Sequence, residues 1–243
     1  MPDHLVLTLA APFGAMGDLA GHERRGTAAW PARSAILGLL GGALGVERDD
    51  PEGQAALGAW RMAVATLAFR GRDARLGLPL RDYHTVQTVP ASVRAPATRR
   101  EALDRGRREG RLSTTLTTRD YVQGCAFLVA LWGGDLAGAQ AALRRPAFAP
   151  YLGRRSCPLA APLDPRVVAA ETPVAALLAP REVPEWLAGA KPVRVASDAF
   201  DGVAAHPGYM VESRWDEPLD RSLWHFARRE VYVLPLVPAG GPS

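Results

Sequence analysis

The stretch Tyr121-Val122-Gln123-Gly124-Cys125-Ala126-Phe127-Leu128-Val129-Ala130-Leu131-Trp132 has the strongest core-strand pattern in this chain of 243 residues. A short apolar run of this kind predicts a strand buried in the middle of a sheet. We therefore take residues 121–132 as the central strand and predict the neighbouring elements outward from it.

Strands and helices follow on both sides of this central strand. After it, Asp135 has the position of a helix cap, and Pro146 ends the predicted helix. Before it, residues 5–9 and 62–69 have the pattern of strands. Between those two strands, the apolar positions of residues 36–44 fit one face of a helix.

A polar insertion separates residues 62–69 from the central strand. Residues 82–89 alternate in character but are too polar for a core strand, and residues 112–118 return as a threonine-rich strand. Between them, the stretch from Arg94 to Arg111 holds seven arginines and three acidic residues. We predict a hairpin over about residues 80–119 with a long basic tip, for which a helix with i,i+4 ion pairs is one possible form.

The order of these elements predicts the fold class. Strand, helix, strand, hairpin, strand, helix and strand give an α+β, ferredoxin-like βαββαβ domain over residues 1–160, an order shared with RNA-binding RRM domains. This order alone does not specify a function. Over residues 161–243, many prolines divide a mostly β segment into short strands at 193–196, 209–215 and 231–236. We expect this segment to pack on the first domain; a degenerate second ferredoxin-like half is the alternative.

The charged residues favour a nucleic-acid partner. The formal net charge is +4, and Lys191 is the only lysine among the 29 Lys and Arg residues. A GC-rich genome produces the same bias toward arginine. Arginine nevertheless favours bidentate contacts with phosphate and stacking on bases, so RNA or DNA is the favoured class of partner.

Other features of the composition exclude several classes of protein. Cys125 and Cys157 have no cysteine or histidine at metal-ligand spacing, so we expect two reduced thiols and no zinc site. No apolar run reaches the length of a membrane span, and no secretory signal is visible. We therefore expect a cytoplasmic protein without a membrane contact and without a metal or organic cofactor.

The most distinctive local motif is Tyr151-Leu152-Gly153-Arg154-Arg155-Ser156-Cys157-Pro158. A glycine lets the backbone approach a ligand, and two arginines offer donor forks that match phosphate. Such a loop suits a polyanion, with nucleic acid as the leading candidate. The alternative is a surface turn with two solvated arginines.

Four blocks of the sequence resemble the CasD family, the backbone-capping subunit of the type I-E CRISPR surveillance complex Cascade. They are the first strand with Ala11-Pro12, the run Pro31–Leu40, the run Asp82–Gln87, and Arg119-Asp120-Tyr121 followed by the 151–158 motif. The resemblance implies a ferredoxin-like fold with a thumb hairpin that binds the 5′ handle of a CRISPR RNA. It also implies contacts with a backbone subunit and the large subunit of Cascade, and with target DNA only through the complex.

Residue chemistry and this resemblance together predict the RNA-binding residues. They are Arg33, Ser34, Tyr83, His84, Gln87, Arg108, Arg119, Gly153, Arg154, Arg155 and Ser156. Arg33 and Ser34 stand at a predicted helix start, where free N–H groups favour anions. There the alternative is that Ser34 only caps the helix and Arg33 is solvated. For the hairpin side chains, the alternative is a face exposed to water.

We expect a binding subunit with no catalytic residue. The main alternative is a metal-independent endoribonuclease that processes CRISPR repeat RNA, with His84 as the base. Against it, the neighbouring Tyr83 points to the opposite face of a strand, and no second histidine lies in a matching motif. A third alternative is a protein-interaction subunit that barely touches RNA.

Overall fold

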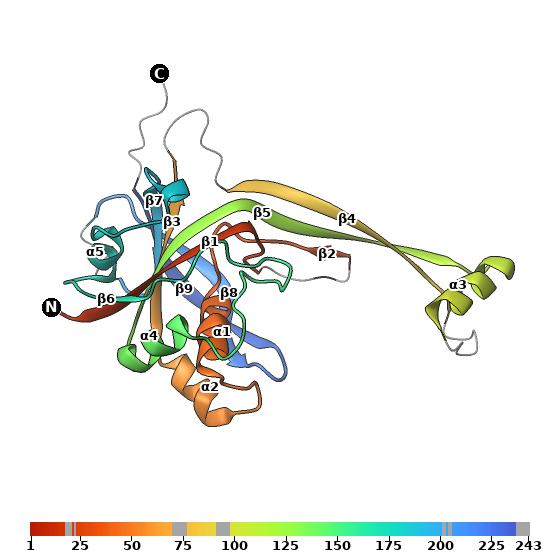
Figure 1. Ribbon diagram of the computed structural model, residues 1–243, viewed down its shortest axis with the longest axis horizontal. Helices are drawn as coiled ribbons and strands as arrows, with labels where there is room; N and C mark the ends of the chain where they lie inside the picture. Colours follow the sequence, from red (N-terminus) through yellow and green to blue (C-terminus); the bar gives the residue numbers. More distant parts are fainter. Residues whose placement is uncertain are drawn as a thin grey trace, which may run out of the picture.

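The computed structural model describes residues 1–17, 21, 23–69, 77–90, 98–200, 203 and 206–236. In these residues the fold is mixed α/β, built on one large and mostly antiparallel sheet (Figure 1). The path of the sheet is β6 (Arg166–Ala169), β1 (Asp3–Gly14), β5 (Ser113–Trp132), β3 (Arg61–Ala68), β7 (Lys191–Ser197), β9 (His225–Pro235) and β8 (Met210–Asp220). Outside this path, β2 (Arg24–Arg25) and β4 (Leu78–Thr88) both pair with β5.

The strand β5 is 20 residues long and organises the molecule. Its inner part lies between β1 and β3, with Val129 opposite both Leu7 and Val64 and fully buried. Its outer part pairs with β4 from Ser113 to Gln123. The sequence predicted two strands, 112–118 and 121–132, but they form one, because the side chains change from polar to apolar while the backbone pairing continues.

The two faces of the sheet support two hydrophobic cores, because successive side chains of a strand point to opposite faces. One core joins Leu7 and Leu9 to residues of α1 (Arg33–Leu44), α2 (Pro51–Gly58) and α4 (Leu136–Arg144). The other core joins Val6 and Ala10 to residues of α5 (Pro173–Leu178). A short 3-10 helix, Glu185–Leu187, adds the buried Leu187 to the second core.

Local signals account for where most helices begin and end. The carboxylate of Asp135 accepts a hydrogen bond from the Gly138 amide at 3.0 Å, which confirms the predicted cap of α4. Helix α1 ends at Gly45 in the left-handed conformation, with φ of 78°. The sequence prediction missed α5, although Thr172 caps it and Pro173 begins it. No helix among the described residues has the length and apolar character needed to cross a membrane.

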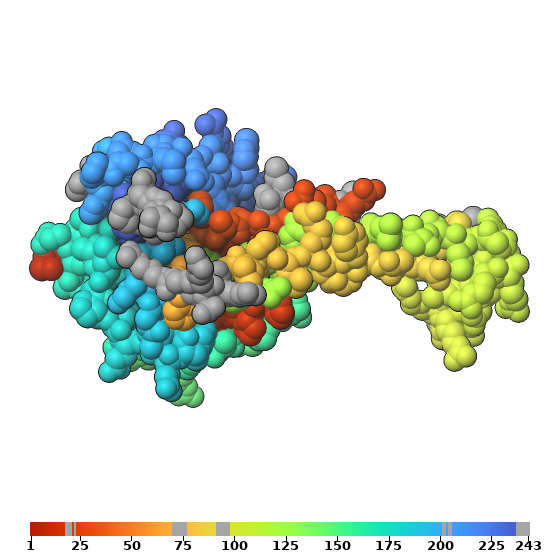
Figure 2. All heavy atoms as spheres, turned by 90° about the horizontal axis from the view of Figure 1, so that it is seen from above, coloured from red at the N-terminus to blue at the C-terminus, as the bar shows by residue number. Residues whose placement is uncertain are grey.

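The hairpin of β4 and β5 projects from the body of the protein (Figures 1 and 2). Its tip carries the helix α3 (Arg99–Arg108), which the Thr98 hydroxyl caps through the amide of Glu101. The helix contains the kind of i,i+4 ion pair that the sequence suggested, between Arg105 and Glu109 at 2.7 Å. Residues 91–97 of the predicted hairpin, including Arg94, lie outside the described residues.

The C-terminal segment continues the same sheet. Strands β7, β8 and β9 correspond to the predicted strands at 193–196, 209–215 and 231–236, and β7 pairs with β3. The division of the chain at residue 160 stays a prediction. Strand β6, which lies after residue 160, pairs with β1.

Candidate nucleic-acid interface

Three strands meet at the base of the hairpin. Strand β2 lies along β5, with Arg24 beside Thr118 and Arg25 beside Arg119, and the Thr118 amide donates to the Glu23 carbonyl at 2.7 Å. Strand β4 lies along the other edge of β5. Figure 1 shows β2 beside the root of the hairpin, where the long strands leave the body.

The pairing defines two faces at this hairpin base, because directly opposed residues share a face and neighbours along a strand do not. One face carries Tyr121, Arg119, Asp82 and His84, and we call it the Tyr121 face. The other, the Asp120 face, carries Arg81, Tyr83 and Gln87 on β4. The predicted RNA contacts of the hairpin are therefore divided between two faces.

On the Asp120 face, one carboxylate holds two arginines. The Asp120 oxygens accept from Arg81 Nε at 2.7 Å and from Arg24 Nη2 at 3.1 Å. The hydrogen bonds from Arg81 and Arg24 lower the pKa of Asp120 to about 2. Asp120 is therefore ionised at neutral pH and offsets part of the positive charge of this face.

The guanidinium of Arg154 joins the 151–158 motif to the hairpin base. Its two terminal nitrogens donate to the backbone carbonyls of Asp120, at 3.3 Å, and Arg25, at 3.2 Å. The same group lies 4.6 Å from the centre of the Tyr121 ring, within the range of a cation–π contact. Arg154 thus contacts both β2 and β5.

The shape of the 151–158 motif requires glycine at position 153. Gly153 has a φ of 86°, and an ideal Cβ there would stand 1.6 Å from the carbonyl oxygen of Ala15. The glycine thus allows a close approach to the protein's own backbone. An approach of Gly153 to RNA stays a prediction, as does a contact by the exposed Ser156.

Three arginines around Arg154 define what we call the arginine cluster, namely Arg25, Arg119 and Arg155. Arg155 follows Arg154 in the chain, the Arg25 carbonyl accepts from Arg154, and Arg119 pairs with Arg25. Arg25 and Arg155 are exposed and Arg119 is half-buried. Within the described part of the chain, no hydrogen bond or ion pair engages these three guanidinium groups. Asp82 lies opposite Arg119 on the same face, but its carboxylate contacts His84, so the cluster offers guanidinium groups that no described carboxylate engages.

His84 and Arg108 lie where the sequence predicted them, on the first strand of the hairpin and at its tip. His84 Nε2 lies 2.6 Å from a carboxylate oxygen of Asp82 on the Tyr121 face. Arg108 is exposed on α3 at the far end of the hairpin, where its Nε donates to the Asp104 carbonyl at 3.4 Å (Figure 1).

The predicted anion site at the start of α1 requires a correction. Arg33 is only 5% exposed, and its guanidinium pairs with Asp198 at 2.9 Å and with Glu217 at 2.7 Å. The Asp216 carboxylate accepts from the Arg33 amide at 2.8 Å, so the protein itself supplies the anion at this helix start.

Ser34 does not cap the helix, so that alternative is wrong, whereas an RNA contact by the half-buried Ser34 stays a prediction. The N-cap residue of α1 is Ala32, whose own side chain cannot cap the helix, and the Ser34 carbonyl accepts from Arg221. Neither the predicted RNA contact at Arg33 nor its solvated alternative agrees with the internal ion pairs.

Sequence reasoning missed Arg24, Arg25 and Arg81. The first two form one of the six adjacent arginine pairs in the sequence, a signal of the same kind as Arg154-Arg155. It was overlooked because β2 has only two residues and therefore no periodicity.

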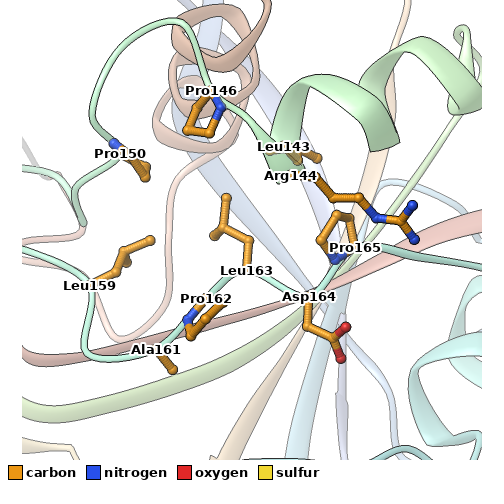
Figure 3. Close-up of a pocket in the computed structure, with 10 residues that line it drawn as sticks. All are labelled: Leu143, Arg144, Pro146, Pro150, Leu159, Ala161, Pro162, Leu163, Asp164 and Pro165. Carbon is orange, nitrogen blue, oxygen red and sulfur yellow. The ribbon is translucent and has the colours of Figure 1, made fainter.

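The body also contains a cavity of about 340 Å³ between the end of α4 and residues 159–165 (Figure 3). Its walls are mostly proline and leucine, including Pro146, Pro162 and Leu163, with Arg144 and Asp164 as the charged members. No group of three His, Cys, Asp or Glu side chains among the described residues is arranged to hold a metal ion. The cavity lacks the cluster of polar groups that a catalytic site requires.

Comparison with known proteins identifies the chain as a CRISPR-associated protein. Residues 4–232 match the family model described as CRISPR-associated protein (Cas_Cas5), and the chain belongs to this family. The CRISPR system Cascade subunit CasD of Escherichia coli (strain K12) is 32% identical in an alignment of 241 residues that covers 96% of this chain and 96% of the relative. The family resemblance of the sequence motifs is thereby confirmed.

Two solved structures share the fold. One is described as a CRISPR RNA-guided surveillance complex, with a TM-score of 0.62 and 24% identity over 98% of this chain and 94% of the other. The second, described as the crystal structure of a Cas protein, has a TM-score of 0.56 and 24% identity over 98% of this chain and 100% of the other.

Proposed function

We propose that this protein is a non-catalytic subunit of a type I-E Cascade complex, in which it binds the 5′ handle of a CRISPR RNA and caps the backbone filament. The observation that carries the proposal is the arginine cluster at the hairpin base, whose guanidinium groups form no ion pair with the described residues. Family membership and the similarity to a Cascade subunit support the same function.

We infer that the first part of the chain is a ferredoxin-like domain and that the β4–β5 hairpin is its thumb. The strand order β6-β1-β5-β3, with α1 between β1 and β3 and α4 between β5 and β6, supports this assignment. The strands after residue 190 extend the sheet of this domain. The complex would act in the cytoplasm, where its partners are the CRISPR RNA, a backbone subunit and the large subunit, and target DNA reaches it only through the complex.

In the proposed mechanism, Arg25, Arg119 and Arg155 hold consecutive phosphates of the RNA. Each contact with a single strand contributes about −0.7 to the slope of log K against log salt, so three contacts give about −2. On the Tyr121 face, His84 would contact the same strand. On the Asp120 face, Tyr83 and Gln87 would contact a nucleotide that passes around the open edge of β4.

The test mixes the purified full chain with labelled CRISPR repeat RNA in EDTA and follows both binding and cleavage. We expect salt-dependent binding to intact RNA, and a loss of most affinity in the double variant Arg119→Glu and Arg155→Glu. The control Arg145→Glu reverses an exposed charge on the body and leaves most of the affinity intact.

Two outcomes would contradict the proposal. Equal binding by the double variant and the wild type would exclude the arginine cluster as the RNA site. Cleavage of the RNA that His84→Ala abolishes would favour the endoribonuclease alternative, because a base is needed near the 2′-hydroxyl.

A further inference from the structure

The two adjacent arginines of the 151–158 motif have different surroundings. Both terminal nitrogens of Arg154 donate to backbone carbonyls, and the central carbon of its guanidinium lies over the Tyr121 ring. Arg155 is exposed, and no described residue pairs with its guanidinium. The pair therefore contains one arginine already engaged within the protein and one available to a ligand.

The contacts of Arg154 connect segments that are distant in the chain. The Arg25 carbonyl lies 129 residues before Arg154, and the Asp120 carbonyl lies 34 residues before it. Strand β2 has only two residues, and pairing of that length gives little stability by itself. The Arg154 guanidinium supplies an additional attachment of β2 to the hairpin base, beside the bond from the Thr118 amide to Glu23.

We infer that Arg154 is a positioning residue, which fastens β2 against β5 and thereby orients Arg25 and Arg119, and that Arg25 and not Arg154 contacts an RNA phosphate. The part of this inference that concerns RNA rests on the proposed function. The fastening of β2 is independent of it.

Arginine and lysine differ in the chemistry that each role requires. A planar guanidinium can donate to two carbonyls at once and stack on a ring, whereas an ammonium group is a point charge that does neither as well. Lysine still binds phosphate. A conservative change to lysine should therefore be tolerated at an arginine that contacts phosphate. At Arg154 the same change should weaken the attachment of β2 to β5.

The first experiment measures hydrogen exchange in the full chain without RNA. We expect Arg154→Lys to accelerate exchange of the Thr118 amide about tenfold, as for the loss of about one hydrogen bond, while amides of 125–131 keep their protection. Arg155→Lys is the matched control and should leave the Thr118 amide unchanged. Unchanged exchange at Thr118 in both Arg154→Lys and Arg154→Met would overturn the fastening role.

The second experiment measures the salt dependence of binding to a labelled single-stranded repeat RNA. Arg25→Met and Arg155→Met should each flatten the slope by about 0.7, and Arg155→Lys should keep the slope of the wild type. Arg154→Met and Arg154→Lys should both weaken binding with the slope nearly unchanged. The inference would be overturned if Arg154→Met flattened the slope of log K against log salt by about 0.7 and Arg154→Lys kept the slope of the wild type.

The two experiments separate this inference from the proposed function. If the wild-type chain binds no repeat RNA, the proposed function fails and so does the assignment of Arg25 as a phosphate contact. The exchange rate of the Thr118 amide still decides whether Arg154 fastens β2.

Discussion

The backbone of Gly153 lies directly against the carbonyl group of Ala15, so closely that an ideal Cβ on Gly153 would stand 1.6 Å from that oxygen. The Ala15 amide also donates to the Leu152 carbonyl at 3.1 Å. This contact seats the 151–158 motif on the end of β1 and fixes where Arg154 leaves the loop toward Tyr121.

Replacing Gly153 by alanine should therefore destabilise the protein strongly. The change Gly153→Ala adds a clash with backbone to the cost of a positive φ, and we expect the free energy of unfolding to fall by about 2–4 kcal/mol. Gly17→Ala is the control, since Gly17 has a φ of 73° and open space around it. Its cost should be about 1 kcal/mol. Urea denaturation measures the free energy of unfolding of both variants. Equal losses of stability would show that the backbone at Ala15 shifts at little cost to make room for the added Cβ.

The buried ion pairs of Arg33 predict a large effect on stability. Burial raises the pKa of Asp198, and Arg33→Met removes one of the cations that pair with this carboxylate. Breaking such a pair costs about 3–5 kcal/mol. Arg155→Met, at an exposed position, should change the free energy of unfolding by less than about 0.5 kcal/mol. Similar chemical denaturation curves for the two variants would contradict the structural role of Arg33.

The case of Arg33 shows what sequence patterns could not supply. The helix start was predicted correctly, but Asp198 and Asp216 lie 165 and 183 residues further along the chain. Local spacing contains no information about such partners. By contrast, the cap Asp135 acts within three residues and was predicted from the sequence.

The candidate site was predictable to a similar degree. The 151–158 motif was found because its residue types suit phosphate, and Arg119 because its block resembles the CasD family. The structure brings Arg154 against Asp120 and Tyr121, the residues that follow Arg119 on β5. The different environments of Arg154 and Arg155 could not be predicted, because the carbonyls that Arg154 contacts belong to backbone, which carries no residue-specific signal. Arg25 was missed because β2, with only two residues, is too short to show the alternation of a strand.

The pairing of Asp120 with Arg24 and Arg81 predicts a specific pH dependence. Because the folded-state pKa, about 2, lies below the usual 3.8, ionised Asp120 stabilises the fold fully above about pH 5. This stabilising contribution declines as the pH falls below about 5 and is lost as the pH passes through about 2, the folded-state pKa. The stability difference between the wild type and Asp120→Asn should follow this course in denaturation at several pH values. A difference independent of pH would contradict the pairing.

Asp120→Asn should lower stability near neutral pH but strengthen RNA binding. Asp120→Asn removes one negative charge and leaves Arg24 and Arg81 without their counter-charge, so affinity for repeat RNA at low salt should rise a few-fold. The slope against salt should steepen. Weaker binding by this variant would show that Asp120 serves mainly to orient the two arginines for RNA.

The thiol of Cys125 should be unreactive in the folded protein. Burial raises its pKa to about 12, and Cys125 is 1% exposed. Since the thiolate is the nucleophile, only about one molecule in ten thousand would carry it at pH 8. Iodoacetamide at pH 8 should modify Cys125 in urea but not in the native state, as read by mass spectrometry. Rapid modification of native Cys125 would show that this part of β5 opens readily.

The division of the hairpin into two faces gives the last prediction. Tyr83 is 70% exposed on the Asp120 face, away from Arg119, and β4 pairs only with β5 among the described strands. If a base passes around the open edge of β4 and stacks on Tyr83, Tyr83→Ala should weaken RNA binding by about 1–3 kcal/mol. The slope against salt should stay the same, because no phosphate contact is lost, and Tyr83→Phe should restore the affinity.

Leu116→Ala provides the matched control, because Leu116 is 60% exposed on the same face but offers no ring for stacking. Its effect on RNA binding should be below about 0.5 kcal/mol. Equal affinities for Tyr83→Ala and the wild type would confine the RNA to the Tyr121 face. In that case His84 and Arg119 would be the hairpin contacts that remain, and His84→Ala would be the variant to weaken binding.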